Sequence, residues 1–358
     1  MTTENLQNSL TRAVEKLDKI TVVCLSMSIW SGAKTISESE IEAAGGAALP
    51  NSIANLGSKK VVNPDDLAPF SKIRTRTYRY LRANGVNFCK GAVAIPLDKS
   101  DEILKGLDSL IEEFDRCKDE FLASYDDKLQ QWIDQNPAYE ELIRNGALSK
   151  SEVESRFGAS LHTLQVQNVR ERDRARNVKL AEDLGSRLLD EVSTDAEKYC
   201  VSIVTKETIS RRGISVVEKF REKLSSLSFL TDKIIPVVSL LDGVLSRIPE
   251  KGDLEGEIAG DFKAAVTILA NRRLLQQFID GLITFESQRT TFFGLSSAFA
   301  GGKTSQPTSA NAPAPQDAET DLFATVESSD VHSEQKEDLV AQPVNQETKK
   351  EPLASFFF

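Results

Sequence analysis

Residues 103–121, ILKGLDSLIEEFDRCKDEF, decide the fold of this chain. Apolar side chains recur there at alternating spacings of four and three residues, which is the period of one helix face. They are Ile103, Leu107, Leu110, Phe114, Cys117 and Phe121. Because no proline interrupts it, we expect one helix over about residues 97–135, on the order of 55 Å long at a rise of about 1.5 Å per residue. A helix of that length needs a long partner, as in coiled coils and interaction scaffolds.

A second helical period, over about residues 174–204, predicts the antiparallel partner of this helix. Three short stretches predict a small sheet, because they alternate apolar and polar residues or form bounded apolar runs. They are residues 20–30, 86–95 and 161–169. Further helical periods lie between residues 217 and 282. We therefore expect a mainly α fold with a small β-sheet (α+β), in which a long antiparallel helical hairpin is joined by a helical bundle.

The composition changes sharply after about residue 298, to Gly, Ser, Thr, Pro, Gln and acidic residues. This predicts a mainly helical domain over residues 1–298 and a disordered acidic C-terminal tail over residues 299–358. The tail ends in Phe356, Phe357 and Phe358. Three aromatic rings on a flexible tether are typical of a docking peptide, and a tail of this length also allows them to fold back on their own domain.

Composition also limits the classes of protein to which this chain can belong. The 358 residues carry a formal net charge of −10, which argues against a general nucleic-acid binder. The longest apolar runs, around residues 20–30 and 234–245, are shorter than the roughly 20 residues that cross a bilayer. The first 19 residues lack the apolar centre of a signal peptide. We expect a cytoplasmic protein without a membrane partner, and its oligomeric state stays open.

No pattern of catalytic or metal-binding residues is found in the sequence. The four cysteines stand far apart, and the two histidines lie near none of them: Cys24, Cys89, Cys117, Cys200, His162 and His332. This spacing predicts four reduced, packed thiols and no metal or other cofactor. No acid–base pair can be named, so we expect a protein that is not an enzyme. Residues 31–62 lack any period and predict a long loop, which is where an unrecognised hydrolase site would lie.

Positive charge gathers between residues 59 and 82, with Tyr78 and Tyr80 interleaved. The cations that would form a basic surface are Lys59, Lys60, Arg74, Arg76 and Arg79. Such a surface could contact phosphates. The simpler interpretation, which we favour, is a solvated helix face whose arginines neutralise carboxylates elsewhere in an acidic protein.

Three ordered motifs resemble an uncharacterised family, domain of unknown function 3150. They are Trp30-Ser31-Gly32-x-Lys34, Leu56-Gly57-Ser58-Lys59-Lys60-Val61 with Pro64 downstream, and Ala94-Ile95-Pro96. The resemblance spans about residues 20–290. It implies an origin in bacteriophages or mobile elements, with MoxR-type AAA+ ATPases and von Willebrand A-type proteins encoded nearby. The family has no assigned activity, so the resemblance supplies no catalytic residues.

These observations favour a non-enzymatic interaction or adaptor protein in a bacterial host cytoplasm, with a protein partner that the resemblance suggests is an AAA+ ATPase. The alternative is a nucleic-acid-associated phage or plasmid factor that uses residues 59–82. Only the alternative predicts DNA binding that weakens steeply as salt rises.

Overall fold

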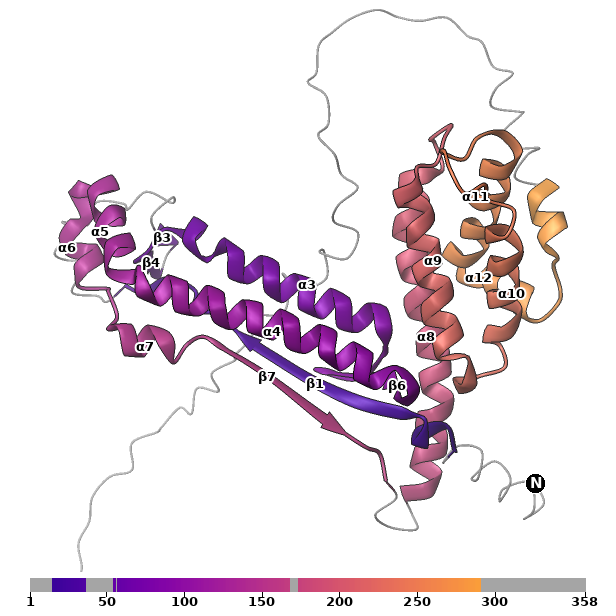
Figure 1. Ribbon diagram of the computed structural model, residues 1–358, viewed down its shortest axis with the longest axis horizontal. Coiled ribbons are helices and arrows are strands. Elements are labelled where there is room, and N and C mark those ends of the chain that lie inside the picture. Colours follow the sequence, from indigo (N-terminus) through magenta and orange to yellow (C-terminus); the bar gives the residue numbers. More distant parts are fainter. Residues whose placement is uncertain (1–14, 37–53, 56, 168–172, 291–358) are drawn as a thin grey trace, which may run out of the picture. The chain divides into compact units, whose positions relative to one another are not determined.

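The computed structural model describes residues 15–36, 54–55, 57–167 and 173–290, and these form a mainly helical fold with a small antiparallel sheet (Figure 1). They belong to one compact unit, residues 1–324, and a second unit, residues 325–358, lies outside the described residues. The expected domain boundary near residue 298 therefore stays a prediction. The α+β class expected from the sequence is confirmed. No helix in the described part is both long enough and apolar enough to cross a membrane.

The main sheet has four strands in the order β5-β6-β1-β7, and every neighbouring pair is antiparallel. Its strands are β1 (Ile20–Ser28), β5 (Val86–Cys89), β6 (Ala92–Pro96) and β7 (Gly158–Leu164). The sequence predicted residues 86–95 as part of the sheet, and the structure has a hairpin there, with Gly91 at a φ of +79° in its turn. The predicted strand at 20–30 is β1.

β1 contributes to two hydrophobic cores because its side chains alternate between the two faces of the sheet. Ile20 and Val22 belong to the core of the later helices, whereas Val23, Leu25 and Met27 belong to the core of the earlier ones. The first half of β1 is therefore covered on both faces.

The earlier helices are α3 (Ala68–Asn84), α4 (Ser100–Ala123), α5 (Tyr125–Gln135), α6 (Glu140–Arg144) and α7 (Lys150–Glu154). Short 3-10 helices join them: η1 (Pro64–Leu67), η2 (Leu97–Lys99) and η3 (Pro137–Tyr139). Side-chain caps mark the start of two of these helices. Asn63 accepts the Asp65 backbone N–H at η1, and Ser149 with Glu152 forms a capping box at α7.

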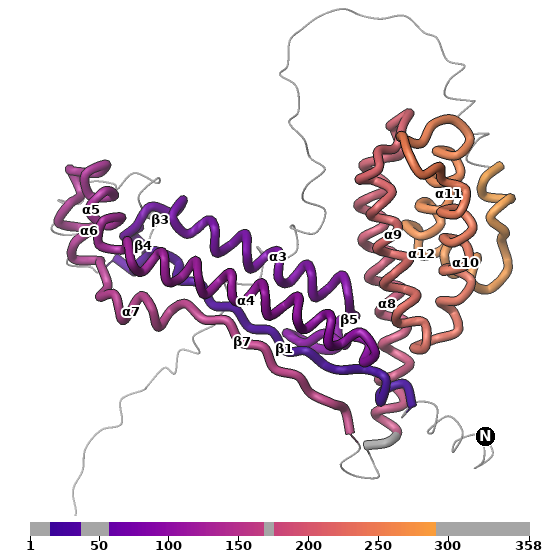
Figure 2. The backbone as a smooth tube through the Cα atoms, viewed as in Figure 1, coloured from indigo at the N-terminus to yellow at the C-terminus, as the bar shows by residue number. Residues whose placement is uncertain are grey.

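α3 and α4 form the long antiparallel pair of this fold. Figure 2 follows the backbone from α3 through the β5–β6 hairpin into α4. Tyr80 lies against Gly106, and Arg76 pairs with Glu113, so residues further along α3 meet residues earlier in α4. Edge-on aromatic contacts close the core, with the Phe70 ring centroid 5.5 Å from that of Phe114 and 5.8 Å from that of Phe121.

Two expectations about the long helices are corrected. Residues 97–135 form η2, α4 and α5 instead of one helix, because the backbone leaves the helical region at Ser124, where φ is −102° and ψ is 10°. The second long helix, α8 (Asp173–Ile203), packs mainly on α11 (Gly256–Ala270) and is not the partner of α4. α4 and α8 each have an apolar stripe, and the two stripes pack on opposite faces of the sheet.

The later helices form the second core around α8 and α11. The others are α9 (Arg211–Ser226), α10 (Ile234–Leu245) and α12 (Arg272–Ile279), with the 3-10 helix η4 (Ser228–Leu230) between α9 and α10. Small residues on α11 let it approach α8 closely, among them Ala259, Gly260 and Ala264, which are all buried.

Two further expectations are corrected. The strand predicted at residues 161–169 is β7, which begins and ends earlier because one-for-one pairing with β1 sets its bounds. The loop expected at residues 31–62 contains a second, three-stranded antiparallel sheet in the order β2-β4-β3. Its strands are β2 (Ala33–Thr35), β3 (Ala54–Asn55) and β4 (Ser58–Lys60). Residues 37–53 and 56 of that loop lie outside the described residues.

Candidate functional site

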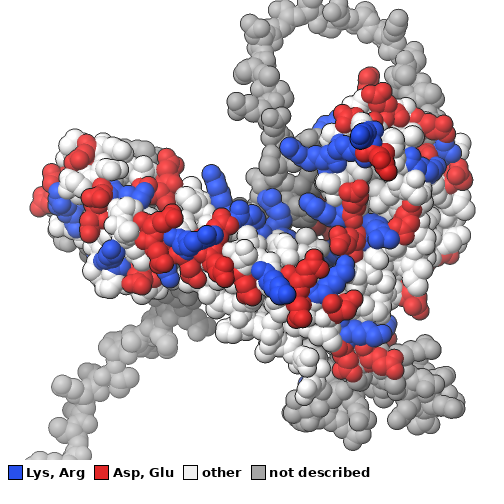
Figure 3. All heavy atoms as spheres, viewed as in Figure 1, with Lys and Arg blue, Asp and Glu red and all other residues white. Residues whose placement is uncertain are grey.

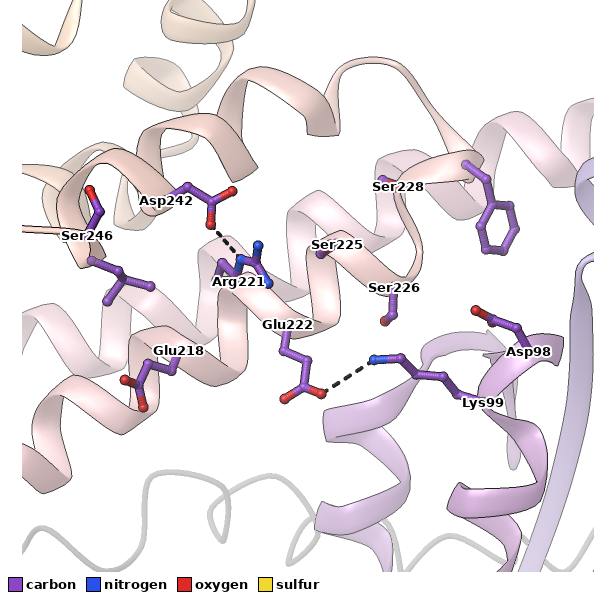
Figure 4. Close-up of a pocket in the computed structure, with 12 residues that line it drawn as sticks. Asp98, Lys99, Glu218, Arg221, Glu222, Ser225, Ser226, Ser228, Asp242 and Ser246 are labelled. Carbon is purple, nitrogen blue, oxygen red and sulfur yellow. Dashed lines mark hydrogen bonds and ion pairs between the residues drawn. The ribbon is translucent and has the colours of Figure 1, made fainter.

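A groove of about 940 Å³ lies between α9, α10 and the 3-10 helix η2 (Figure 4). α9 presents it with one side of its last three turns, from Glu218 to Ser226. Asp242 and Leu245 come from α10, and Asp98 from η2. The opposite side of α9 carries Val217, Phe220 and Leu224, which are buried. This amphipathic division leaves charged and hydroxyl side chains facing the groove.

Two ion pairs cross the groove. The Arg221 Nε donates to the Asp242 Oδ1 at 2.6 Å, and the Lys99 Nζ lies 3.4 Å from the Glu222 Oε1 (Figure 4). The hydrogen bond to Asp242 raises the pKa of the Arg221 guanidinium above its ordinary value. All four side chains are substantially exposed, so each pair contributes only about 0.2–1 kcal/mol to stability.

The groove keeps an excess of negative charge. Within the described part of the chain, Asp98 and Glu218 have no cationic partner, so four carboxylates face two cations. Ser225, Ser226 and Ser228 add hydroxyl groups to the same wall. The arrangement suits a polar ligand that carries positive charge, such as a lysine- or arginine-bearing segment of another chain.

A buried lysine on α9 fixes the position of this helix, which forms one wall of the groove. Lys223 is 7% exposed, and its Nζ donates to the Glu191 Oε2 of α8 at 2.9 Å and to the Arg82 carbonyl of α3 at 2.8 Å. Glu191 also accepts the Asn87 backbone N–H of β5 at 2.8 Å. The Lys223 ammonium therefore joins α9 to α8 and to the C-terminal end of α3.

Asp195 lies one turn further along α8. Burial raises the pKa of its carboxyl group, while Lys223 and Lys198 act in the opposite direction.

The predicted basic surface does not form as a unit. Lys59 is 1% exposed, because strand alternation in β4 turns it inward, where its side chain lies against Gly146; it therefore belongs to no surface. Lys60 is exposed, and Arg76 is paired with Glu113. Arg74 and Arg79 are half-buried. On the face seen in Figure 3, lysines and arginines are interspersed with aspartates and glutamates.

The other candidate residues are placed as follows. Phe356, Phe357 and Phe358 lie outside the described residues. Cys89 is exposed, and burial raises the thiol pKa of Cys117 and of Cys200. In the described ranges, no three His, Cys, Asp or Glu side chains come together as a metal site would require.

Several residues of the three sequence motifs that carry the resemblance are packing residues. Trp30 is buried and meets the Tyr125 ring edge-on, with centroids 6.0 Å apart. Gly32 has a φ of +67°, and a Cβ there would lie 2.7 Å from a Leu67 methyl group. Ile95 of the third motif is fully buried. These buried motif residues build the fold, and no described residue of the three motifs lines the groove.

A family model described as "Protein of unknown function (DUF3150)" matches residues 17–271. The match covers β1 through α11, and so includes the whole groove and both cores except the residues of α12, such as Leu275. No curated protein and no solved structure matches the chain.

Proposed function

Since the chain belongs to the DUF3150 family of proteins of unknown function, we propose that it is a non-enzymatic adaptor protein of a phage or mobile element, working with a MoxR-type AAA+ ATPase in a bacterial host cytoplasm. The observation that carries this proposal is the charged groove between α9, α10 and η2. Two carboxylates of the groove have no cationic partner in the described part of the chain. Its two ion pairs are weak enough for a ligand cation to replace one of their own cations.

A ligand cation can join this groove at low cost. Asp98 and Glu218 are available to it without breaking an ion pair of the described structure. A second cation can replace Arg221 at Asp242, because an exposed pair is worth only about 0.2–1 kcal/mol. Electrostatic attraction of this kind mainly raises the rate of association and selects among partners.

The test is a binding measurement between the purified full chain and a MoxR-type ATPase encoded in the same genome, with ATP and with ADP. The double variant Asp98→Lys/Glu218→Lys is expected to bind at least about tenfold more weakly than the native chain, because it reverses the charge of the groove. The matched control, Asp127→Lys/Glu154→Lys, makes the same charge change at exposed positions on α5 and α7. Equal losses in both variants would show that net charge alone controls binding, and the groove would lose its role.

The C-terminal phenylalanines are proposed as a second contact to the same partner, tethered to the domain by the tail. Deleting Phe356–Phe358 should leave the melting temperature unchanged and weaken capture of the ATPase. Capture at the native yield would remove the tail from the proposal.

A nucleic-acid-associated function is the second candidate. Lys60 and Lys72 remain exposed cations in the stretch where the sequence predicted a basic surface, although Lys59 does not. This function predicts binding to duplex DNA whose affinity falls steeply between 50 and 200 mM salt. Replacing Lys60 and Lys72 by Glu should abolish that binding, and a native chain that binds no DNA at low salt would exclude it.

A further inference from the structure

The two edge strands of the main sheet, β5 and β7, differ in how far they are protected from pairing with another strand. At the β5 edge, the Asn87 N–H donates to the Glu191 carboxylate at 2.8 Å, and the Phe88 carbonyl accepts from Arg187 at 2.7 Å. An irregularity in the pairing between Asn87 and Cys89 also breaks the line of that edge. Side chains of α8 and a bulge therefore prevent further strand pairing at β5.

Among the described residues, nothing protects the β7 edge in these ways. β7 pairs with β1 residue for residue, from Gly158 with Ser28 to Leu164 with Val22, and no register shift interrupts it. Its sequence, GASLHTL, contains no proline and no lysine, arginine, aspartate or glutamate. Ser160, His162 and Thr163 are exposed, and Leu164 is 56% exposed. A straight, uncharged edge of this length is a template for another strand.

Few described groups satisfy the β7 backbone from outside the sheet. The side-chain hydrogen bond to it in the described part of the chain runs from the Ser28 hydroxyl to the Gly158 carbonyl at 3.4 Å. Ser28 lies on β1, which is the paired side. In an antiparallel strand every second residue directs both its N–H and its C=O away from its neighbour, so β7 presents a row of such groups outward.

The surroundings of this edge indicate which segment would fit. α4 packs against β7, and Ala159 and Leu161 point to the same core as Leu104 and Ile111 of α4, all four being half-buried. An added strand would extend the sheet beside α4 and cover these apolar groups. α4 carries eight carboxylates against three cations, so long basic side chains at the same positions would meet a favourable charge.

The other face of the sheet has a different character at this edge. Ser26, Ser28 and Ser160 are exposed there, and they lie with His162 and Leu164 on the face that α4 does not cover. Hydroxyl side chains on an added strand would match them by cross-strand hydrogen bonding.

We propose that β7 is a strand-addition site that binds an extended segment of a partner protein, with valine-like and basic side chains directed toward α4 and small hydroxyl side chains on the opposite face. A second copy of this chain fits less well. Two-fold antiparallel pairing of β7 with itself places both α4 helices on the same face of the joined sheet, where their surplus carboxylates repel. The inference is independent of the groove and of the ATPase.

The probe is a fluorescent seven-residue peptide, Arg-Thr-Val-Thr-Val-Thr-Arg, titrated with the full chain. Binding should be saturable and should weaken at least about tenfold when both peptide arginines are replaced by glutamate. N-methylation of alternate peptide amides, in each of the two possible phases, should abolish binding in one phase, because only that phase removes the donors that pair with β7. Hydrogen exchange of the β7 amides should slow on peptide addition.

The protein variant is Thr163→Arg, which places a cation on the exposed edge and should weaken peptide binding at least about tenfold. Gln131→Arg adds the same charge at an exposed position on α5 and should bind as the native chain does. Both variants should melt at the native temperature. Absence of peptide binding by the full chain, binding unaffected by Thr163→Arg, or a self-associated native chain that Thr163→Arg makes monomeric would each overturn the proposal.

Discussion

Replacing Lys223 by methionine tests the junction that holds α9 against α8 and α3. The substitution keeps the apolar stem and removes an ammonium that is 7% exposed. It leaves the Arg82 carbonyl without this donor and the Glu191 carboxylate with only the Asn87 N–H in the described structure. Breaking one partner of a fully buried ion pair costs about 3–5 kcal/mol. The Glu191 side chain is 28% exposed and recovers some hydration, so we expect a loss of about 2–3 kcal/mol.

The assay is equilibrium unfolding in urea, followed by the fluorescence of Trp30, which is buried, and Trp132. The midpoint should fall while the slope stays constant. Lys219→Met is the control, since Lys219 is exposed on the same helix and its loss should change stability by less than about 0.5 kcal/mol. In a double-mutant cycle with Glu191→Gln, the two substitutions should be coupled by about 1–2 kcal/mol. Equal costs for Lys223→Met and Lys219→Met, or strictly additive effects in the cycle, would refute the reasoning.

The structure supports three further predictions. Phe114→Ala should lower the free energy of unfolding by about 3–5 kcal/mol, because the ring is fully buried against Phe70, and calorimetry at two scan rates would measure the loss. Burial raises the folded-state pKa of Asp195, so its contribution to stability is present below the unfolded pKa near 3.8 and is lost as pH rises through the raised value. Asp195→Asn should therefore gain stability relative to the native chain between pH 3.5 and 7, and a pH-independent difference would contradict this. With iodoacetamide at pH 8, the exposed Cys89 should react before Cys200, whose thiol pKa burial raises, and peptide mass spectrometry would reveal the opposite order if burial did not control the rate.

Local patterns in the sequence predicted the elements well. The seam from Ile103 to Phe121 predicted a helix face that the structure buries, with Ile103, Leu107 and Phe114 among its most buried residues. The break at Ser124 left no trace in the pattern, because apolar spacing continues across it. One residue whose backbone leaves the helical region, as Ser124 does, interrupts a helix without changing its composition.

The sequence did not predict which helices and strands pack against one another. The apolar periods of α4 and α8 do not indicate that the two helices pack on opposite faces of one sheet. The predicted pairing of these helices was therefore wrong. Lys59 is a further example, since it is buried against Gly146, which is distant in the sequence. The groove draws its walls from three separate stretches, around residues 98, 222 and 242, and no motif marks any of them.

The burial of β1 on both faces determines how the described region unfolds. Val22 and Val23 are neighbours in the chain, yet each is buried in a different core. Melting either core uncovers one side of the strand that the other core still requires, so the two helical layers cannot unfold one at a time without exposing apolar surface. The described region should therefore behave as one cooperative unit, in which the amides at the start of β1 exchange with solvent only through global unfolding.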